Sequence, residues 1–591
     1  MSINDRLSAL RKAMSAHKID AYVIPSTDPH QSEYVATHWK GREWISGFTG
    51  SAGVVVVTQD HAGLWTDSRY FIQAEEELSS SNFKLHKVIK QGAPMHEEWI
   101  LSQLSSDSIV GIDASLFSIA QVKAMRKRLY KKNIQIHDSI DLLKDAWVDR
   151  PALPKEAIFE HDIKYAGESR HEKLERVREK MKELEANQYF ISTLDDIAWL
   201  YNIRGKDVAC NPVAIAYGIV TEEKALLFID QQKLSESLKV ALEADEIHLS
   251  DYSNVQDYLL DLAPPTKVLV NTASCNADLF QSIHADAVIK GDNIVMHMKA
   301  VKNETELAHF REVMKKDAVA LCKLFMWLEE EIEQRSVPEA ELAEQLIAYR
   351  AEGAGYYGES FDAIVGYEAN GAIVHYRPEH GKCANIKKGG MLLLDSGGQY
   401  TDGTTDITRT VTYGIASQEQ KTAYTAVLKG HIGLAKAKFP AGTIGGQLDI
   451  LARQHLWQHG LNYLHGTGHG VGFFLNVHEP PQGFAPGLSS RSNTTIVPGM
   501  VTSNEPGFYK EGAFGIRIEN LIISHQSSDE GFLDFETITL FPIDTQLIDK
   551  TQMSAEDIKW LNDYHKEVEE KLNPLLNDKQ RQWMKNKCLA I

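Results

Sequence analysis

Hydrophobic and polar positions change their period along the chain, and these changes separate a repeated N-terminal part from a different C-terminal part. The chain opens with a helical pattern over residues 3–17, followed by apolar runs at 21–24 and 53–58 that predict buried strands. Another run at 64–71 predicts a strand that is followed by a helix to about Leu78. Strands that alternate with helices predict an α/β fold.

The same plan recurs further along the chain. A strand at 188–191, a segment around Trp199, and strands at 216–220 and 227–230 follow one another in the order of the first copy. Two prolines in the stretch 150–154 mark the joint between the copies. The sequence therefore predicts a duplicated α/β domain and not an array of short repeats.

Beyond about residue 300 the pattern predicts a long amphipathic helix and then a region rich in strands. Asn303 and Glu306 have the spacing of an N-cap and its capping-box partner, for a helix that runs to about Glu333. Pro338 suits the first position of a second helix, and Gly353 suits its end. We predict a mixed α/β (α+β) protein with three domains, at 1–152, 153–300 and 301–591.

Composition and charge exclude some functions. The 591 residues are 43% hydrophobic and 24% charged, which is ordinary for a globular protein of several domains. A formal net charge of -19 argues against nucleic acid as a partner. No apolar run approaches the roughly 18 residues that span a bilayer, so no membrane partner is expected. Five scattered cysteines and an N-terminus without an apolar signal core favour free thiols in the cytoplasm.

The candidate chemistry starts in the stretch 391–412. An apolar strand ends on Asp395, a patch of turn-forming residues follows, and a second strand with period-two alternation begins near Asp406. The two aspartates would lie on neighbouring arms of a hairpin. An aspartate at a strand end usually caps a turn, so this pair alone does not establish a site.

Three later segments change the interpretation. They carry His469 in the glycine-rich stretch 465–470, Glu505 before a Pro-Gly turn, and Glu519 in a strand pattern. Carboxylates with one imidazole suit Mn²⁺, Co²⁺ or Zn²⁺. Four carboxylates held together would repel by roughly 4 kcal/mol per pair at 4 Å in an intermediate dielectric. Two divalent cations would cancel that charge if the residues converge, which spacing alone does not show.

These segments resemble the pita-bread metallopeptidase family, which includes methionine aminopeptidase, prolidase and aminopeptidase P. The resemblance implies one ligand on the first metal, two bridging ligands, and a histidine and a glutamate on the second metal. It also implies that this glutamate shuttles a proton for a hydroxide activated by both metals. Asp395 is the implied ligand of the first metal, and Asp406 and Glu519 are the implied bridging ligands. His469 and Glu505 are the implied ligands of the second metal.

Further residues are expected around the metals. The resemblance implies that His375, on a predicted alternating strand, and His478 hydrogen-bond the substrate carbonyl and stabilise the tetrahedral intermediate. Arg517 lies two residues before Glu519 and is predicted to hold a ligand carboxylate through an ion pair. His465 matches no ligand and is predicted to support the glycine-rich turn.

The whole chain resembles the long, three-domain form of aminopeptidase P (Xaa-Pro aminopeptidase). The stretches 20–28, 44–53 and 65–70 match that form closely. The resemblance implies two creatinase-like N-terminal domains before the catalytic one, a substrate-binding Arg69, two Mn²⁺ ions, with Co²⁺ or Zn²⁺ as other candidates, and a homodimer. It also implies release of the first residue from a peptide substrate whose second residue is proline.

Two alternatives remain at this stage. A prolidase-like dipeptidase would use the same chemistry in a site closed to longer peptides. A non-catalytic pita-bread module would bind peptides without cleaving them, although such relatives lose ligands and all five candidates stand here.

Overall fold

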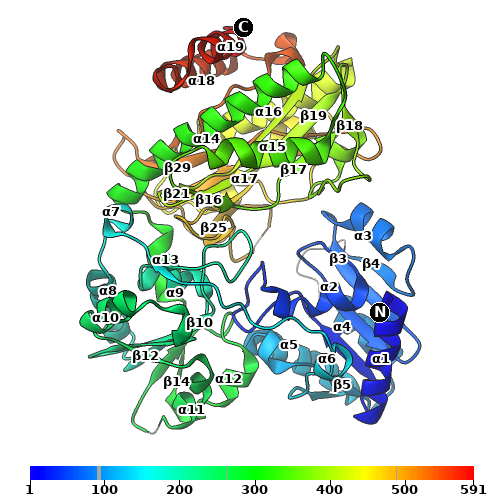
Figure 1. The fold of residues 1–591 in the computed structure, drawn as a ribbon, viewed down its shortest axis with the longest axis vertical. Coiled ribbons are helices and arrows are strands. Elements are labelled where there is room, and N and C mark those ends of the chain that lie inside the picture. Colours follow the sequence, from blue (N-terminus) through cyan, green and yellow to red (C-terminus); the bar gives the residue numbers. More distant parts are fainter. Residues whose placement is uncertain (89–94, 263, 488) are drawn as a thin grey trace. The chain divides into compact units, whose positions relative to one another are not determined.

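The computed structural model describes residues 1–88, 95–262, 264–487 and 489–591. These residues form two compact units, which are described separately (Figure 1). The first unit contains residues 1–161 and 168–295, and the second contains 162–167 and 296–591. The predicted domain boundaries at 152 and 300 remain predictions.

The first unit begins with a six-stranded sheet in the order β4-β3-β2-β1-β5-β6. β2 is antiparallel to both β1 and β3, and the other neighbours are parallel. The predicted helix at the start is confirmed as α1. Ser2 is its N-cap and forms a capping box with Asp5. The elements are α1 Ile3–Ala16, β1 Ala21–Ile24, α2 Gly41–Ser46, β2 Val54–Thr58, β3 Ala62–Asp67, α3 Phe71–Leu78, β4 Lys84–Val88, α4 Met95–Gln103, β5 Ile109–Gly111, α5 Ile119–Leu129, β6 Gln135–His137 and α6 Leu143–Ala146.

A second sheet in the same unit repeats this topology. Its order is β12-β11-β10-β8-β13-β14, and its parallel and antiparallel pairs follow the same sequence as in the first sheet. The predicted duplication is therefore confirmed. The elements are α8 Arg170–Glu183, β8 Gln188–Ile191, α9 Leu194–Leu200, β10 Ala216–Thr221, β11 Ala225–Ile229, α10 Glu236–Ala244, β12 Ile247–Ser250, α11 Val255–Leu260, β13 Val268–Val270, α12 Ala277–Gln281 and β14 Val288–Lys290, with a separate two-stranded antiparallel sheet of β7 Phe159–Glu160 and β9 Ile203–Arg204.

The third strand is shorter than predicted. We predicted a strand over 64–71, but β3 ends at Asp67 and α3 begins at Phe71. The side chain of Asp67 accepts a hydrogen bond from the backbone N–H of Arg69, and the Asp67 carbonyl accepts one from Tyr70. An aspartate that bonds to the backbone two residues on favours a turn over a continued strand.

Two long helices, α14 and α15, follow the start of the second unit's main segment, and the sequence predicted the start of the first correctly. α14 (Glu304–Glu331) has Asn303 as N-cap, and the predicted capping box with Glu306 is confirmed. Pro338 is the N-cap of α15 (Glu339–Ala351) and not its first residue, so this prediction was wrong by one position. The other helices are α7 Ile163–Ala166, α16 Gln418–Ala435, α17 Gly445–Trp457, α18 Ala555–Leu572 and α19 Asp578–Lys587, and α13 (Ile294–Ala300) crosses the division between the units.

Two main sheets of the second unit hold the candidate site residues. One has the order β17-β19-β22, and the larger one has the order β23-β30-β29-β26-β24-β25. Smaller sheets pair β15 with β18, β16 with β20 and β21, and β27 with β28. The strands are β15 Val337–Pro338, β16 Tyr356–Glu359, β17 Ile364–Tyr367, β18 Asn385–Ile386, β19 Met391–Ser396, β20 Gly398–Tyr400, β21 Gly403–Thr404, β22 Ile407–Thr412, β23 Phe439–Pro440, β24 Gly468–Gly470, β25 Glu479–Phe484, β26 Val501–Asn504, β27 Gly507–Lys510, β28 Phe514–Arg517, β29 Asn520–Gln526 and β30 Phe532–Thr537.

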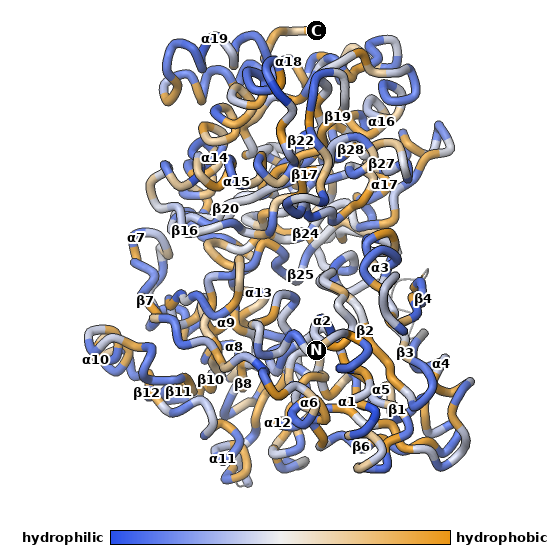
Figure 2. Tube along the Cα trace, turned by 45° about the vertical axis from the view of Figure 1, so that its right-hand side comes forward, coloured by the Kyte–Doolittle hydropathy of each residue, from blue (hydrophilic) through white to orange (hydrophobic). Residues whose placement is uncertain are grey.

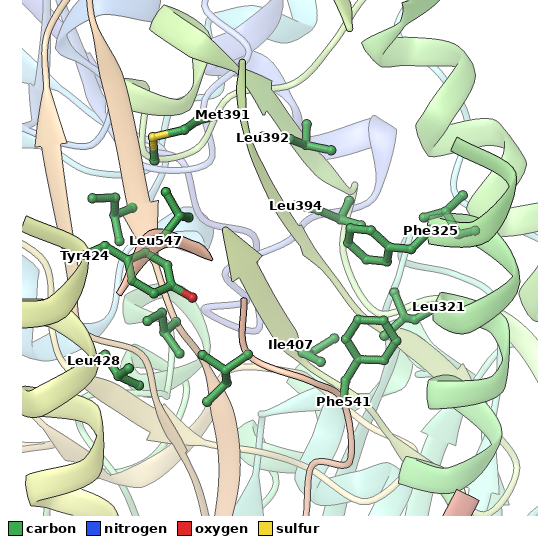
Figure 3. Packing of buried hydrophobic residues seen from close by; sticks show 14 of the residues in the cluster. Leu321, Phe325, Met391, Leu392, Leu394, Ile407, Tyr424, Leu428, Phe541 and Leu547 are labelled. Atoms are coloured by element: carbon green, nitrogen blue, oxygen red, sulfur yellow. The ribbon is translucent and has the colours of Figure 1, made fainter. Parts of the chain in front are cut away.

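A hydrophobic core joins these sheets to the helices. Figure 3 shows Leu394 of β19 facing Phe325 of α14, and Ile407 of β22 near Phe541. Tyr424 of α16 belongs to the same cluster of buried residues. The strand β19, which carries Asp395, thus packs in one core with helices α14 and α16.

Hydropathy follows the elements. Figure 2 shows hydrophobic residues along strands such as β1 and β2, whereas α19 is mostly hydrophilic. Within the described ranges, no helix is both long enough and apolar enough to cross a membrane.

Candidate metal centre and active site

The hairpin of β19 and β22 carries the two candidate aspartates, as the strand pattern predicted. The pairing register aligns Asp395 with Thr408 and Ser396 with Ile407. Asp406 comes directly before β22, so both carboxylates lie at the same end of the hairpin. The short strands β20 and β21 form the connection between the two arms.

The large sheet brings the other three candidates to neighbouring strands. His469 is the central residue of β24, which pairs with β26. Glu505 follows the last residue of β26, and Glu519 precedes the first residue of β29. Because Asn504 and Asn520 are paired across β26 and β29, the two glutamates lie at the same end of adjacent strands. We had predicted that Glu519 lies inside a continuous strand. It lies instead between β28 and β29.

The two sheets bring these residues to one point. Asp406, His469 and Glu519 each offer a ligand atom, and these atoms lie within 4.8 Å of one another. His469 Nε2 is 3.5 Å from Asp406 Oδ2 and 3.5 Å from Glu505 Oε1. Asp395 is close enough that its charge acts on Asp406 and Glu519, and its Oδ2 accepts a hydrogen bond from Arg517 Nη2 at 2.6 Å. All of these side chains are buried or mostly buried.

A glycine allows the strands to approach this closely. A Cβ atom on Gly468 would lie 1.9 Å from the carbonyl oxygen of Ser503. Any side chain there would push β24 away from β26 and would move His469 with it. His469 is further held by its backbone N–H, which donates to Ser503 Oγ at 3.0 Å.

The electrostatics of the cluster are unfavourable without a cation. Burial, and then the charges of neighbouring carboxylates, raise the pKa of Asp406 and of Glu519 well above their usual values. Burial also raises the pKa of Glu505 to about 7, although Arg517 and His478 oppose the shift. Among the described residues, Asp395 Oδ1 is a buried oxygen with no hydrogen-bond partner. Oxygen ligands with one imidazole, an orphaned carboxylate oxygen and unbalanced negative charge together fit divalent cations.

The predicted histidines lie near these residues. The rings of His478 and His469 are nearly perpendicular, with centroids 4.3 Å apart. His375 lies in a turn after a short 3₁₀ helix at Glu368–Ala372, so the prediction of a strand was wrong. Its neighbour Val374 accepts a hydrogen bond from Arg517 Nη2 at 3.4 Å. His465 contacts the Gly466 carbonyl at 2.7 Å, in the glycine-rich turn.

The chain is similar to known proteins over its whole length. Residues 308–525 match metallopeptidase family M24, and residues 531–591 match the C-terminal region of that family. Residues 6–144 and 149–306 each match a creatinase/prolidase N-terminal domain. Xaa-Pro aminopeptidase 1 of Dictyostelium discoideum is 41% identical, over 100% of this chain and 97% of its own length. The chain belongs to metallopeptidase family M24, in the branch that contains the Xaa-Pro aminopeptidases.

Two other relatives of this branch agree over the full length. Aminopeptidase P2 of Arabidopsis thaliana is 39% identical, over 99% of this chain and 88% of its own length. The crystal structure of X-prolyl aminopeptidase from Caenorhabditis elegans, described as a cytosolic enzyme with a di-nuclear active site, is 34% identical and covers 100% of both chains with a TM-score of 0.96. The expected architecture of two creatinase-like domains followed by a pita-bread domain is confirmed.

Arg69 lies in the first unit, in the turn between β3 and α3. Its Nε and Nη2 donate to the two carboxylate oxygens of Asp67, both at 2.8 Å. This bidentate pair fixes the plane of the guanidinium group. Its role as a substrate-binding residue of the M24 site remains a prediction.

Sequence reasoning missed several residues that support the M24 ligands. Thr408 Oγ1 donates to Glu519 Oε2 at 2.8 Å, and Ser503 Oγ donates to Glu505 Oε1 at 3.3 Å. Tyr509 Oη accepts a hydrogen bond from Arg517 Nη1 at 2.6 Å. Thr408 was visible in the alternating pattern of the second arm, but a threonine in a strand is too common to indicate such a contact.

Two buried side chains, Arg409 and His431, form hydrogen bonds at the ends of β26 and β29 that lie next to Glu505 and Glu519. Arg409 donates to the Glu519 carbonyl at 2.6 Å and to Asn520 Oδ1 at 2.8 Å. His431 of α16 lies 3.1 Å from Asn520 Nδ2 and 3.1 Å from the Asn504 carbonyl. His431 thus joins α16 to the ends of β26 and β29, next to Glu505 and Glu519.

Proposed function

We propose that this chain is a metal-dependent aminopeptidase that releases the N-terminal residue from peptides with proline in the second position. The observation that carries the proposal is the full-length similarity to Xaa-Pro aminopeptidases, at 41% identity to the Dictyostelium discoideum protein. A prolyl peptide bond has no N–H and its proline has a fixed φ, so a site shaped for the ring favours this substrate.

Two divalent cations would be held by Asp395, Asp406, His469, Glu505 and Glu519. The buried carboxylates support this assignment, since their charge needs compensation. We expect Mn²⁺, with Co²⁺ or Zn²⁺ as the other candidates, because oxygen ligands and one imidazole suit these ions. When bound, the cations supply Lewis acidity to the scissile carbonyl and neutralise developing negative charge.

The chain's own side chains would orient the substrate and move protons. Glu505 would serve as the proton shuttle, since a carboxylate beside the bound water can accept its proton and pass it on. His478 lies against His469 and would donate a hydrogen bond to the carbonyl oxygen of the scissile bond, together with His375. Arg517 holds Asp395 through the ion pair at 2.6 Å and thereby keeps this carboxylate oriented.

Location, assembly and the N-terminal contribution belong to the same proposal. The similar protein of Caenorhabditis elegans is described as cytosolic, and Cys275, Cys322, Cys383 and Cys588 are free thiols here, which supports a cytoplasmic enzyme. We propose a homodimer and a substrate contact by Arg69. Replacement of Arg69 by Met should raise KM without changing the bound metal, and an unchanged KM would remove Arg69 from the site.

The decisive experiment measures hydrolysis of an Xaa-Pro-Xaa tripeptide by metal-stripped protein with and without added Mn²⁺. An Xaa-Pro dipeptide and an Xaa-Ala-Xaa tripeptide serve as comparisons. We expect Mn²⁺-dependent release of the first residue from the proline tripeptide. Cleavage of the dipeptide alone would identify a prolidase-like dipeptidase, and no cleavage with any metal would indicate a binding module.

Replacement of Glu505 by Gln tests the proton-transfer role within the same assay. Loss of a positioned acid–base group lowers kcat by about 10²- to 10⁴-fold. Glu511→Gln is the matched control, because Glu511 is exposed on the next turn of the chain. Equal activity of the two variants would contradict the role of Glu505.

A further inference from the structure

Glu339 is a fully buried carboxylate at the first position of α15, with an exposed fraction of 0%. A carboxylate at this position meets the free N–H groups of a helix start, which favour negative charge. Ion pairs at Glu339 do not occur among the described side chains, so hydrogen bonds oppose the cost of its burial but do not cancel it. A buried carboxylate with such a network is costly to keep, and its partners indicate its use.

Four groups of the described residues donate hydrogen bonds to this carboxylate. The backbone N–H of Tyr367 donates to Oε1 at 2.6 Å, and the N–H of Ala384 donates to Oε2 at 2.8 Å. The Asn370 amide donates to the two oxygens at 3.1 and 2.9 Å, and the Tyr376 hydroxyl donates at 2.9 Å. An ionised carboxylate is acceptor-only, so it satisfies all four groups. The amide of a glutamine would bring a donor against donors.

These donors lie at both ends and in the middle of one segment, residues 367–384. The segment contains His375, directly before Tyr376. Its other side is fixed by Arg517, whose Nη2 donates to the Val374 carbonyl at 3.4 Å and to Asp395 at 2.6 Å. One guanidinium nitrogen thus joins the backbone next to His375 to a predicted metal ligand.

The close contact with β28 limits the segment further. A Cβ atom on Gly515 would lie 1.7 Å from the Gly371 carbonyl oxygen. The segment therefore packs directly on the backbone of the strand that ends with Arg517. Glu339 on one side and β28 on the other leave the turn at His375 little freedom.

We propose that Glu339 is a positioning residue that sets the His375 imidazole for its hydrogen bond to the substrate carbonyl. This inference rests on the proposed function, in which His375 donates to that oxygen. Glu339 acts through Asn370, Tyr376 and the two backbone N–H groups and does not touch the substrate. Its effect should fall on kcat and not on KM, because a carbonyl donor acts mainly as charge develops in the transition state.

A double-mutant cycle with Glu339→Gln and His375→Ala tests the inference. His375→Ala should lower kcat by about 10²- to 10³-fold, as loss of one oxyanion donor does. Glu339→Gln should lower kcat by about tenfold to a hundredfold, the scale of a misplaced group. In the double variant, Glu339→Gln should add almost nothing to His375→Ala. If the two factors multiply, Glu339 acts independently of His375 and the inference is wrong.

Controls separate positioning from folding and from metal binding. Glu341→Gln changes a carboxylate of the same helix turn that pairs with Arg335 at the surface, and it should leave kcat unchanged. Bound Mn²⁺ per chain should be the same in Glu339→Gln and the unmodified protein, and loss of metal would overturn the inference.

Tyr376→Phe serves if Glu339→Gln does not fold. It removes a single donor to the carboxylate and should lower kcat severalfold with unchanged metal, again without further effect in the His375→Ala background. Unchanged kcat in Tyr376→Phe, with Glu339→Gln unfolded, would also overturn the inference. Failure of the proposed function is distinct, because the unmodified protein would then not cleave the proline tripeptide.

Discussion

At the scale of single residues, the candidate site holds several buried carboxylates close together, and their mutual repulsion is unfavourable until cations are bound. Asp406 and Glu519 are buried with exposed fractions of 3% and 1%, and each is close to other carboxylates. Their raised pKa values show that ionising them in this surrounding costs free energy. The carboxylates that bind the metals should therefore lower the free energy of unfolding of the metal-free protein.

Asp406→Asn tests this conflict. Removal of one buried charge should stabilise the metal-free protein at pH 8, on the order of 1 kcal/mol, which is the free energy of one pKa unit. Mn²⁺ should raise the melting temperature of the unmodified protein and not that of Asp406→Asn, which should also lose activity. Thermal unfolding with and without Mn²⁺ measures both effects.

Asp529→Asn is the control for that experiment, since Asp529 lies on the surface beside Lys438. It should change the free energy of unfolding of the metal-free protein by no more than about 0.5 kcal/mol. It should also leave the response to Mn²⁺ unchanged. A clearly destabilised metal-free Asp406→Asn protein would contradict the dominance of carboxylate repulsion.

Gly468→Ala addresses the close approach of the ligand strands. The new Cβ would meet the Ser503 carbonyl at 1.9 Å, so β24 must move. We expect a loss of about 1–3 kcal/mol in the free energy of unfolding, typical of overpacking, and weaker Mn²⁺ binding because His469 moves with the strand. Urea unfolding and a Mn²⁺ titration measure these changes.

Gly358→Ala is the matched control on β16. Among the described atoms, none lies within 4 Å of a Cβ built there. This variant should retain Mn²⁺ binding and nearly all stability, and equal effects of the two substitutions would show that Gly468 has no special role.

At the scale of elements, helix α18 is bonded to the segment 539–543, which follows the last strand of the large sheet. Tyr564 Oη lies 2.9 Å from each of the carbonyls of Thr539 and Phe541, which share its one proton, and it accepts from Arg409 at 2.9 Å. His565 Nε2 accepts the Ile543 N–H at 3.1 Å and is 0% exposed. The helix thus contributes polar contacts as well as apolar packing.

The pH dependence of stability should report on His565. Burial, and then the charge of Arg409, lower its pKa to about 4. In the unfolded chain the imidazole takes up a proton near pH 6.5, but in the folded protein it does so only near pH 4. Its contribution is therefore complete above pH 6.5 and is lost as the pH falls towards 4.

His565→Gln should reduce this acid sensitivity, because glutamine can accept the Ile543 N–H without titrating. The slope of unfolding free energy against pH between 6.5 and 4 should decrease by close to one proton. Urea unfolding at several pH values gives the slope. An unchanged slope would show that His565 takes up its proton equally in both states, and His459→Gln at the surface is the control.

At the scale of the whole molecule, the chain forms two compact units, and all five predicted metal ligands belong to the second. A ligand that binds only the folded form of one unit raises the stability of that unit. The increase is about 2.7 kcal/mol at a free concentration one hundred times Kd.

Calorimetry should therefore show two transitions, of which Mn²⁺ moves only one. In Asp406→Asn, Mn²⁺ should move neither transition. This result would assign the transition that moves in the unmodified protein to the second unit. A single transition that moves as a whole with Mn²⁺ would show that the two units unfold together.

The sequence by itself determined the local structure and the identity of the candidate ligands. Short apolar runs and helical patterns predicted the strands β1 and β8, the helix α14 and its capping box, because these features depend on neighbours within a few residues. Resemblance supplied the ligand set through short motifs around Asp395, His469 and Glu519. Turns were less certain, as the early end of β3 and the turn at His375 show, since side-chain hydrogen bonds to the backbone decide them.

Only the tertiary structure decided which of these residues meet. The register of β19 with β22, and of β26 with β29, brings Asp395 and Asp406 to one hairpin end and Glu505 and Glu519 to one sheet end. The contacts of Glu339 cross 28 to 45 positions of sequence, so no local pattern could indicate them. The physical reason is that burial and hydrogen bonding act through distance in space, whereas a sequence pattern reports only neighbours along the chain.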